Sequence, residues 1–242
     1  MRHYRRDPES KKKADGTWVT EADWAVEAQI RLRIARTYPD HNVLGEEEGL
    51  TRSGGGDPVE GAPTWVIDPI DGTNNYIAGI PIWATLVGLE VDGKAVLGVA
   101  HAPALDETYD AAAGAGARMN GEPIEVAPVQ SLAEATVLYA SLSSFVEKGL
   151  DGAFEDLAAN SYRTRGFGDF WGHMLVARGA AHVMIEPELR TWDFRPLETI
   201  VSEAGGRQTT LTGGTLADHG SVVTTCGSIH GEVLDVFARA RG

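Results

Sequence analysis

The sequence predicts a mixed fold in which an α+β half with an antiparallel sheet precedes an α/β half. In residues 83–126, apolar runs are separated by tight-turn signals at Asp92-Gly93 and Asn120-Gly121, a pattern typical of antiparallel hairpins. Beyond residue 133, strand-like runs alternate with helix-like runs, as in an α/β unit with a mixed sheet. The pattern changes at residues 128–133, so we expect one half at residues 1–130 and the other at residues 131–242.

The first helix is expected at residues 20–37. Thr20 and Asp23 at its start are spaced as in a capping box, and Pro39 ends it. Its apolar residues recur every four positions and share one face: Ala22, Val26, Ile30 and Ile34. A short apolar run at Val43 and Leu44 follows, and a glycine-rich loop at residues 53–58 leads to the next strand.

The remaining elements follow from the same periodicities. Strands are expected at residues 84–91 and 95–100, and then at 136–140, 182–185 and 222–225. Helices are expected at residues 149–159, 170–177, 195–204 and 230–241. The second half therefore alternates strand and helix along its length.

Composition narrows the classes of partner. The chain of 242 residues has a formal net charge of −14, which argues against nucleic acid because phosphates attract basic surfaces. The same charge opposes an anionic substrate unless bound cations reverse the local sign. Cys226 is the one cysteine, so no internal disulfide forms and a reducing cytoplasm is expected. No run approaches the roughly 18 apolar residues of a membrane span, and the N-terminus lacks the apolar stretch of a secretory signal.

The sequence WVIDPIDGTN at residues 65–74 is the most informative segment. Asp68 and Asp71 follow an apolar run and flank a proline, and the next residues suit a tight turn or a helix start. Such a turn aims two carboxylates and a backbone carbonyl at one point. Mg²⁺ prefers oxygen ligands and is often shared between carboxylates and a substrate phosphate. The segment therefore predicts part of a metal-dependent, phosphate-handling site.

Five carboxylates are candidates for this site, and each also has a structural explanation. Asp23 completes the capping box, Glu46 lies in an acidic loop, and Asp71 precedes a turn glycine. Asp193 follows Trp192 and precedes an apolar helix, where an N-cap is equally consistent. Asp68 differs, because a charge at the end of an apolar strand is costly unless it is paired or bound to a metal.

The chain resembles the inositol monophosphatase superfamily of Mg²⁺-dependent, Li⁺-sensitive phosphatases. The matching blocks occur in the family's order: VTEAD at residues 19–23, GEE at 45–47, WVIDPIDGTN at 65–74, WD at 192–193 and EAGG at 203–206. The resemblance extends over nearly the whole chain from about residue 12. It implies alternating layers of helix and sheet (αβαβα) with two sheets, and a homodimer.

The resemblance also implies roles for individual residues. The ligands of two or three Mg²⁺ ions would be Glu46, Asp68, the Ile70 carbonyl, Asp71 and Asp193, with Asp68 bridging two ions. The attacking water would be oriented by Thr73, Asp23 and Glu46. The phosphate oxygens would be bound at the helix start formed by Gly72, Thr73 and Asn74. The metal ions would resolve the charge problem, and Li⁺ would inhibit.

The leaving-group pocket decides which phosphate ester is bound. The block TRGFGDFW at residues 164–171 and the later EPE at 186–188 resemble the histidinol-phosphate phosphatases of this superfamily. Asp169 and Glu186 would receive a cationic leaving group, and Arg165 would lie near the ligand. Phe170 or Trp171 would stack on an imidazole. Alternative explanations are a helix N-cap at Asp169, core packing for the aromatic residues and a surface charge at Arg165.

L-histidinol phosphate is therefore the first substrate hypothesis, and it places the enzyme in histidine biosynthesis. An inositol monophosphatase, or a broad-specificity sugar or nucleotide phosphatase, is the alternative within the family. A regulatory binding protein on the same fold is the hypothesis from another class. Lys12 or Lys13 is a further candidate near the site, and the start of the chain is shorter than is usual in the family.

Overall fold

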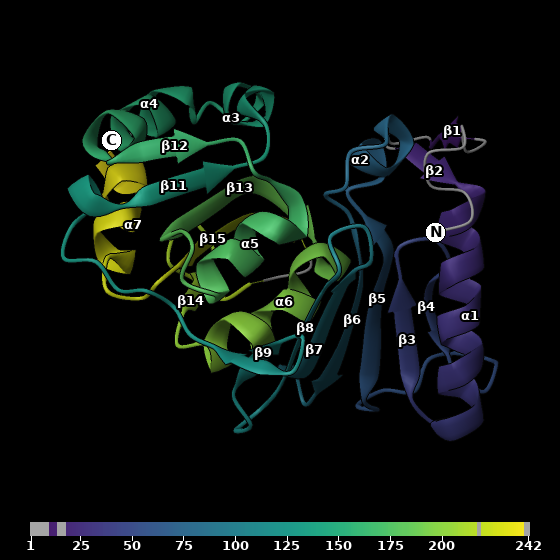
Figure 1. Cartoon of the computed structure of the whole chain (residues 1–242). Coiled ribbons are helices and arrows are strands. Elements are labelled where there is room, and N and C mark those ends of the chain that lie inside the picture. The colour runs from purple at the N-terminus through teal and green to yellow at the C-terminus, as the bar shows by residue number, and fades with distance from the viewer. Residues whose placement is uncertain (1–9, 14–17, 217–218, 240–242) are drawn as a thin grey trace.

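The computed structural model describes residues 10–13, 18–216 and 219–239, and they form alternating layers of helix and sheet (Figure 1). A long helix covers the outer face of the first sheet. Two helices fill the space between the first and second sheets, and further helices cover the outer face of the second sheet (Figure 1). This arrangement confirms the predicted layered fold. The first nine residues of the predicted half at 1–130 and the last three of the predicted half at 131–242 lie outside the described residues. The end of the predicted helix at 230–241 falls in the same undescribed segment.

The first sheet has eight strands in the order β10-β9-β8-β7-β6-β5-β3-β4. Its strands are β3 (Asn42–Gly45), β4 (Gly49–Arg52), β5 (Thr64–Asp71), β6 (Ala84–Val91), β7 (Lys94–Ala102), β8 (Glu107–Ala112), β9 (Ala117–Met119) and β10 (Glu122–Ile124). The pairs from β5 to β10 are antiparallel, as the hairpin signals predicted, whereas β3 and β5 are parallel.

The second sheet is mixed and has five strands in the order β12-β11-β13-β15-β14. Its strands are β11 (Thr136–Tyr139), β12 (Arg163–Arg165), β13 (Val183–Arg190), β14 (Arg207–Thr209) and β15 (His219–Thr225). The strands β12, β11 and β13 are parallel, and β15 is antiparallel to both β13 and β14. A small hairpin of β1 (Ser10–Lys12) and β2 (Trp18–Thr20) precedes the first helix.

The helices are α1 (Glu21–Thr37), α2 (Thr73–Ala78), α3 (Leu142–Glu147), α4 (Asp151–Asn160), α5 (Asp169–Ala177), α6 (Thr191–Glu203) and α7 (His230–Arg239), with a 3₁₀ turn at Leu132–Glu134. Among the described helices, none combines the length and the apolar content needed to cross a bilayer. The capping box expected at the start of α1 is present. The Thr20 amide donates to the Asp23 carboxylate, and the Thr20 side chain accepts from the Asp23 backbone amide.

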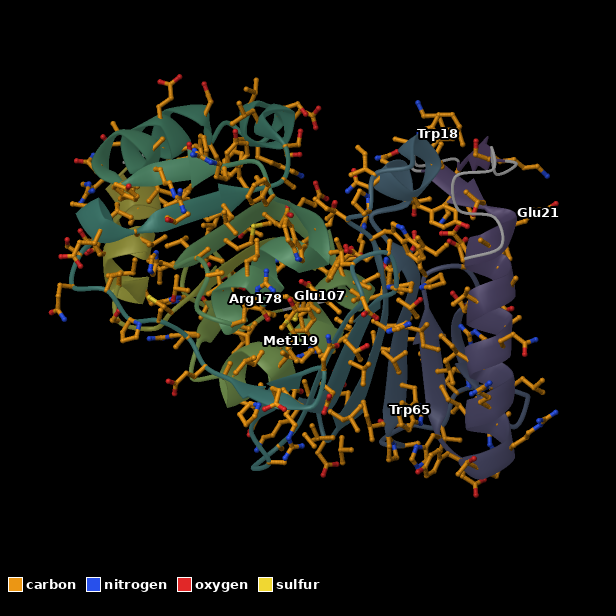
Figure 2. All side chains as sticks on the ribbon, in the orientation of Figure 1. Trp18, Glu21, Trp65, Glu107, Met119 and Arg178 are labelled. Carbon is orange, nitrogen blue, oxygen red and sulfur yellow. The ribbon has the colours of Figure 1, made fainter. Side chains whose placement is uncertain are left out.

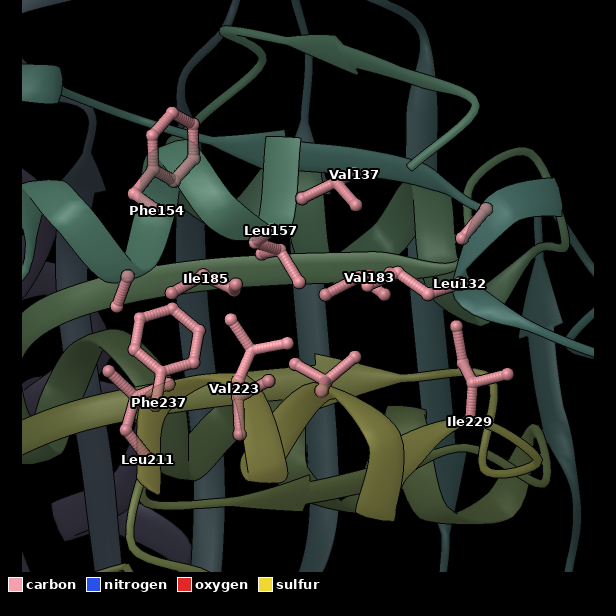
Figure 3. Close-up of a cluster of buried hydrophobic side chains, with 14 of the residues drawn as sticks. Leu132, Val137, Phe154, Leu157, Val183, Ile185, Leu211, Val223, Ile229 and Phe237 are labelled. Atoms are coloured by element: carbon pink, nitrogen blue, oxygen red, sulfur yellow. The ribbon is translucent and has the colours of Figure 1, made fainter. Parts of the chain in front are cut away.

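Two hydrophobic cores hold the layers together. One joins β6–β9 to α5 and α6, and its buried residues include Leu86, Tyr109, Phe170 and Leu197. The other joins the second sheet to α4 and α7, with Val137, Leu157, Val223 and Phe237 at its centre (Figure 3). A smaller cluster joins α5 to the second sheet through Leu138, Val176 and Met184, so buried apolar surface connects each layer to the next.

Helix α6 approaches the first sheet unusually closely. A Cβ atom at Gly98 would lie 2.0 Å from the Pro196 carbonyl oxygen, so only glycine fits at this point of β7. At Gly88 on β6 a Cβ atom would lie 2.9 Å from the Pro196 Cα, so α6 is close to this strand as well. Helix α6 also contacts β5, the strand that carries the acidic motif.

Three local predictions were wrong in detail. We expected the strand to end near Asp68, but β5 continues through Pro69 to Asp71, with a register irregularity between the two aspartates. Proline cannot donate to the strand ladder, so the irregularity lies at the point where a hydrogen bond is lost. Helix α6 begins at Thr191, earlier than expected, and contains Pro196. Asp193 is therefore in the first turn of the helix and is not its N-cap.

Candidate functional site

Three carboxylates from two distant parts of the chain meet at the centre of the molecule. Asp68 and Asp71 come from β5 and Asp193 from α6, and one oxygen of each lies within 4.8 Å of the others. In a regular strand, residues three apart point to opposite faces. The register irregularity between Asp68 and Asp71 therefore explains how both side chains reach one point.

Backbone amides fix the orientation of two of these acids. The Phe170 amide donates to Asp71 Oδ2 at 2.7 Å, and the Arg190 amide donates to Asp193 Oδ2 at 2.7 Å. Asp68 is only 2% exposed, and its Oδ1 has no hydrogen-bond partner among the described residues. A buried, unpaired carboxylate oxygen is costly unless another group compensates it.

The electrostatics of the three acids are unfavourable as they stand. Burial raises the pKa of Asp68 well above its usual range, and the nearby charge of Glu46 raises it further. Burial likewise raises the pKa of Asp71, with Asp169 as the next cause. Burial raises the pKa of Asp193 to about 7. Each acid thus resists ionisation, and a cation at their centre would reverse this effect.

The donor set fits a hard divalent cation. Three convergent carboxylates and an unpaired buried oxygen are the groups that Mg²⁺ or a similar ion prefers. Glu46 lies beside them, since its charge acts on both Asp68 and Asp193. The arrangement can therefore hold a metal ion.

Lys13 contributes the positive charge at the edge of this group. Its Nζ lies 2.8 Å from Glu46 Oε1 and 2.6 Å from Glu47 Oε1. The sequence left Lys12 and Lys13 as equal candidates, and the structure brings Lys13 to the acids.

Thr73 connects the acidic motif to the start of α1. Its hydroxyl lies 2.9 Å from the Ile70 carbonyl oxygen and 3.4 Å from Asp23 Oδ1. Asp23 is fully buried, and its other oxygen accepts from the Thr20 amide and hydroxyl at 2.8 and 2.6 Å. Asp23 therefore completes the capping box and also faces Thr73. Gly72 precedes Thr73 with φ of +80°, a conformation that favours glycine.

A second acidic pair lies next to the three carboxylates. Asp169 is the first residue of α5, and its Oδ2 accepts from Asn75 Nδ2 at 2.7 Å. Its backbone amide donates to Glu186, which is 6% exposed. Burial raises the pKa of Asp169 to about 6, and burial followed by the charge of Asp169 raises the pKa of Glu186 well above its usual range. The adjacent amide of Phe170 binds Asp71, so the two acidic groups are joined through one turn.

The aromatic residues near this pair have different surroundings. Phe170 is 1% exposed and packs in the core, so it does not stack on a ligand. Trp171 is half-buried beside Phe167, and its indole N–H donates to Glu107 at 3.1 Å. Glu107 in turn pairs with Arg178, close to Met119 (Figure 2). Of the two predicted stacking residues, only Trp171 has an accessible ring.

Two predicted substrate residues are not drawn into this group. Arg165 is exposed on β12, where its guanidinium donates to the Thr164 carbonyl at 2.7 Å. Asn74 is exposed on α2, whereas its neighbour Asn75 points to Asp169.

Sequence reasoning missed Asn75 and Glu27. Asn75 directly follows the motif at residues 65–74, so its proximity was available as a signal. Glu27 lies one helical turn after Asp23 on the same face of α1, and a polar residue at that spacing was a second signal.

Comparison with known proteins agrees with these observations. The chain matches the family model described as inositol monophosphatase family over residues 2–241. It is 40% identical over 227 residues to a histidinol-phosphatase of Mycobacterium tuberculosis, covering 92% of this chain and 85% of that protein. It is 34% identical over 201 residues to a fructose-1,6-bisphosphatase/inositol-1-monophosphatase of Aquifex aeolicus, covering 80% and 72%. Among solved structures, a Thermotoga maritima IMPase superposes with a TM-score of 0.87 at 32% identity, covering 100% of this chain and 91% of that one.

Proposed function

The chain belongs to the inositol monophosphatase family of phosphoric monoester hydrolases, and from this premise we propose that it is a Mg²⁺-dependent L-histidinol-phosphate phosphatase. The observation on which the substrate assignment rests is the buried pair Asp169 and Glu186 beside the three carboxylates. The likeness to histidinol-phosphatases of M. tuberculosis and Streptomyces coelicolor, at 40% and 39% identity, supports the same choice.

The proposed metal ligands are those at the meeting point of β5, α6 and the turn after β3: Asp68, Asp71, Asp193, Glu46 and the Ile70 carbonyl. When bound, Mg²⁺ supplies positive charge for the phosphoryl oxygens and lowers the pKa of a bound water. The chain's contribution is to hold these oxygens in place before the ion arrives. The Phe170 and Arg190 amides do this for Asp71 and Asp193.

The proposed water-orienting group is Thr73 with Asp23 and Glu46. Asp23 is anchored by Thr20, so its second oxygen is presented to the Thr73 hydroxyl in a fixed direction. In that arrangement the Thr73 hydroxyl can accept a hydrogen bond from the water while it donates its own hydrogen to Asp23 or to the Ile70 carbonyl, depending on how it rotates. The amides around Gly72, Thr73 and Asn74 are proposed to bind the phosphate oxygens.

The second acidic pair is proposed to recognise the leaving group. Histidinol carries an ammonium and an imidazole that titrates near neutrality, and both are attracted to carboxylates. Inositol is neutral, so its hydroxyls can hydrogen-bond to carboxylates but gain no charge attraction from them. Trp171 is proposed as the ring against which the imidazole packs. Arg165 would then act only at the rim of the site, since its side chain is exposed.

A second candidate within the family is a phosphatase of broader specificity. The 34% identity to the A. aeolicus fructose-1,6-bisphosphatase/inositol-1-monophosphatase favours keeping it. A non-catalytic binding role is disfavoured, because that role needs no cluster of three convergent acids with an unpaired, buried oxygen on Asp68. A homodimer is also proposed, and light scattering of the purified chain would test it.

A phosphate-release panel tests this assignment. The substrates are L-histidinol phosphate, inositol 1-phosphate, fructose 1,6-bisphosphate and a 3′-nucleotide, each measured with Mg²⁺ and with EDTA. We expect kcat/KM for histidinol phosphate to exceed the others by at least about tenfold, which corresponds to about 1.4 kcal/mol of selective transition-state binding. A preference for inositol 1-phosphate would overturn the substrate assignment, and full turnover in EDTA would overturn the metal assignment.

A further inference from the structure

One buried carboxylate close to the site has no part in the proposed reaction. Glu27 lies on α1 one turn after Asp23, and its side chain is fully buried. Its Oε1 accepts from Arg31 Nε at 2.8 Å and from the Glu48 amide at 3.1 Å. Its Oε2 accepts from the Glu47 amide at 2.9 Å. The carboxylate therefore has donors on both oxygens, all from the chain itself.

These contacts hold the turn between β3 and β4, which carries Glu46. Two of the three donors are the backbone amides directly after Glu46. Arg31, also on α1, binds the β4 strand of the same hairpin, donating to the Gly49 carbonyl at 2.7 Å and to the Thr51 hydroxyl at 2.9 Å. The turn is thus fixed to α1 by the Glu27–Arg31 ion pair, which contacts its backbone, and Arg31 Nε also lies 3.6 Å from the Glu48 carboxylate.

The Glu27 carboxylate packs directly against Gly45, the residue before Glu46. A Cβ atom at Gly45 would lie 2.1 Å from Glu27 Oε1, so the carboxylate occupies the space that any other residue there would need. The Glu46 amide also donates to the Ile67 carbonyl on β5 at 3.2 Å. The turn that carries Glu46 is therefore hydrogen-bonded both to α1 and to β5, the strand that carries Asp68.

We propose that Glu27 is a positioning residue for the metal site, which sets the location of Glu46 through the backbone of the turn. The same face of α1 then positions two parts of the site, because Asp23 contacts Thr73 and Glu27 holds Glu46. This inference rests on the proposed function, since it takes Glu46 as a metal ligand.

A carboxylate is required at this position for a geometric reason. Three N–H donors point at its two oxygens. An amide has one acceptor oxygen and one NH₂ group, so Glu27→Gln would direct a donor at a donor. The turn would then lose at least one anchor while the volume of the side chain stays the same.

The test measures Mg²⁺ binding without turnover. Chelator-treated protein is melted over a series of Mg²⁺ concentrations c, and the half-saturating concentration, which equals Kd, is obtained by fitting the logarithmic rise in stability, RT ln(1 + c/Kd). For Glu27→Gln we expect this concentration to increase about 10–100-fold, the usual cost of losing the partner of a metal ligand. With histidinol phosphate, we expect the Mg²⁺ concentration for half-maximal activity to increase in parallel.

Glu203→Gln is the matched control. Glu203 also accepts two backbone amides of a turn, from Gly114 and Gly116 at 2.9 and 2.8 Å. It lies ten residues after Asp193 on α6, about 15 Å along the helix. We expect this variant to lose stability but to keep the wild-type half-saturating Mg²⁺ concentration.

The outcomes separate the inference from the proposed function. If Glu27→Gln does not fold, Glu27→Asp serves in its place, because it keeps the charge and shortens the reach to the turn by one methylene. A folded variant with wild-type Mg²⁺ half-saturation would overturn the inference. If the wild-type protein binds Mg²⁺ but hydrolyses no ester, the proposed function fails, while the shift in Mg²⁺ half-saturation still decides the role of Glu27.

Discussion

Glu27 on α1 and Asp68 on β5 are two buried acids, and they differ in what surrounds them. Glu27 is fully buried, with amides or a guanidinium on both oxygens. Asp68 is 2% exposed, with an unpaired oxygen and other carboxylates as neighbours. Burial is nearly equal in the two cases. We infer that an acid with donors on both oxygens supports the structure, whereas an acid with an oxygen left unpaired among other carboxylates is suited to a cation.

Replacing Asp71 with asparagine should give the largest effect and test this difference most directly. We expect kcat/KM to fall by more than about 100-fold, because losing even an outer partner of a metal ligand costs about 10–100-fold. The Phe170 amide can still donate to the asparagine oxygen, so the local fold is retained. Phosphate release with Mg²⁺ measures the loss.

The same variant should change stability in the direction opposite to Glu27→Gln. Removing a charge from mutually repelling acids should raise the melting temperature of the Mg²⁺-free protein, by about 2–4 °C for each kcal/mol of relief. Removing the charge of Glu27, which has donors, should lower it. Calorimetry of both variants in EDTA decides the matter. If both lower the melting temperature equally, the two kinds of acid are not distinct.

The sequence was sufficient for the fold class and for much of the local structure. The layered arrangement was implied by the family resemblance and is present. The hairpin at Asp92-Gly93 and the capping box at Thr20 were predicted from the residues themselves and are also present. These features depend on short-range chemistry, such as turn residues, caps and apolar periodicity. The grouping of Asp68 with Asp193 came from family resemblance rather than from spacing, because their meeting depends on how α6 packs on β6 and β7.

What could not be predicted depends on long-range contacts. The early start of α6 puts Pro196 inside a helix, against its intrinsic preference, and close packing on Gly98 accompanies it. The link between Asn75 and Asp169 joins residues 94 positions apart, and no local pattern indicates it. The spacing of Glu27 from Asp23 was a signal, but the turn that Glu27 holds is evident only from the fold. The residue roles proposed for the site, and the boundary near residue 130, stay predictions.

The pH dependence of stability provides a second, smaller test of the comparison. Burial raises the folded-state pKa of Asp193 to about 7, above its unfolded value of about 3.9. Its contribution to stability is therefore fully present below about pH 4 and is lost as the pH rises through 7. Without metal, we expect the melting temperature to fall between pH 5 and pH 7.5, and saturating Mg²⁺ should remove this fall.

Two variants show whether Asp193 contributes to that slope. Asp193→Asn should flatten it in EDTA, because the titrating group is gone. Glu203→Gln should not change it in this pH range, since amides of Gly114 and Gly116 hold the pKa of Glu203 below its usual value. An unchanged slope in Asp193→Asn would mean that other groups dominate.

The smallest expected effect concerns Asn75, which donates to Asp169 at 2.7 Å and to the Ile82 carbonyl at 2.9 Å. Asp169 is intermediate between Glu27 and Asp68, because it has one such donor and a pKa still raised to about 6 by burial.

Asn75→Ala removes that donor and leaves the Asp169 carboxylate free to rotate away from the leaving group. A hydrogen bond to a charged group contributes about 1.5–3 kcal/mol. Part of this is recovered by water, so we expect KM for histidinol phosphate to increase about 3–10-fold with kcat nearly unchanged, and no change for inositol 1-phosphate. An equal loss on both substrates would show that Asn75 supports the metal site through α2, and that Asp169 does not select the leaving group.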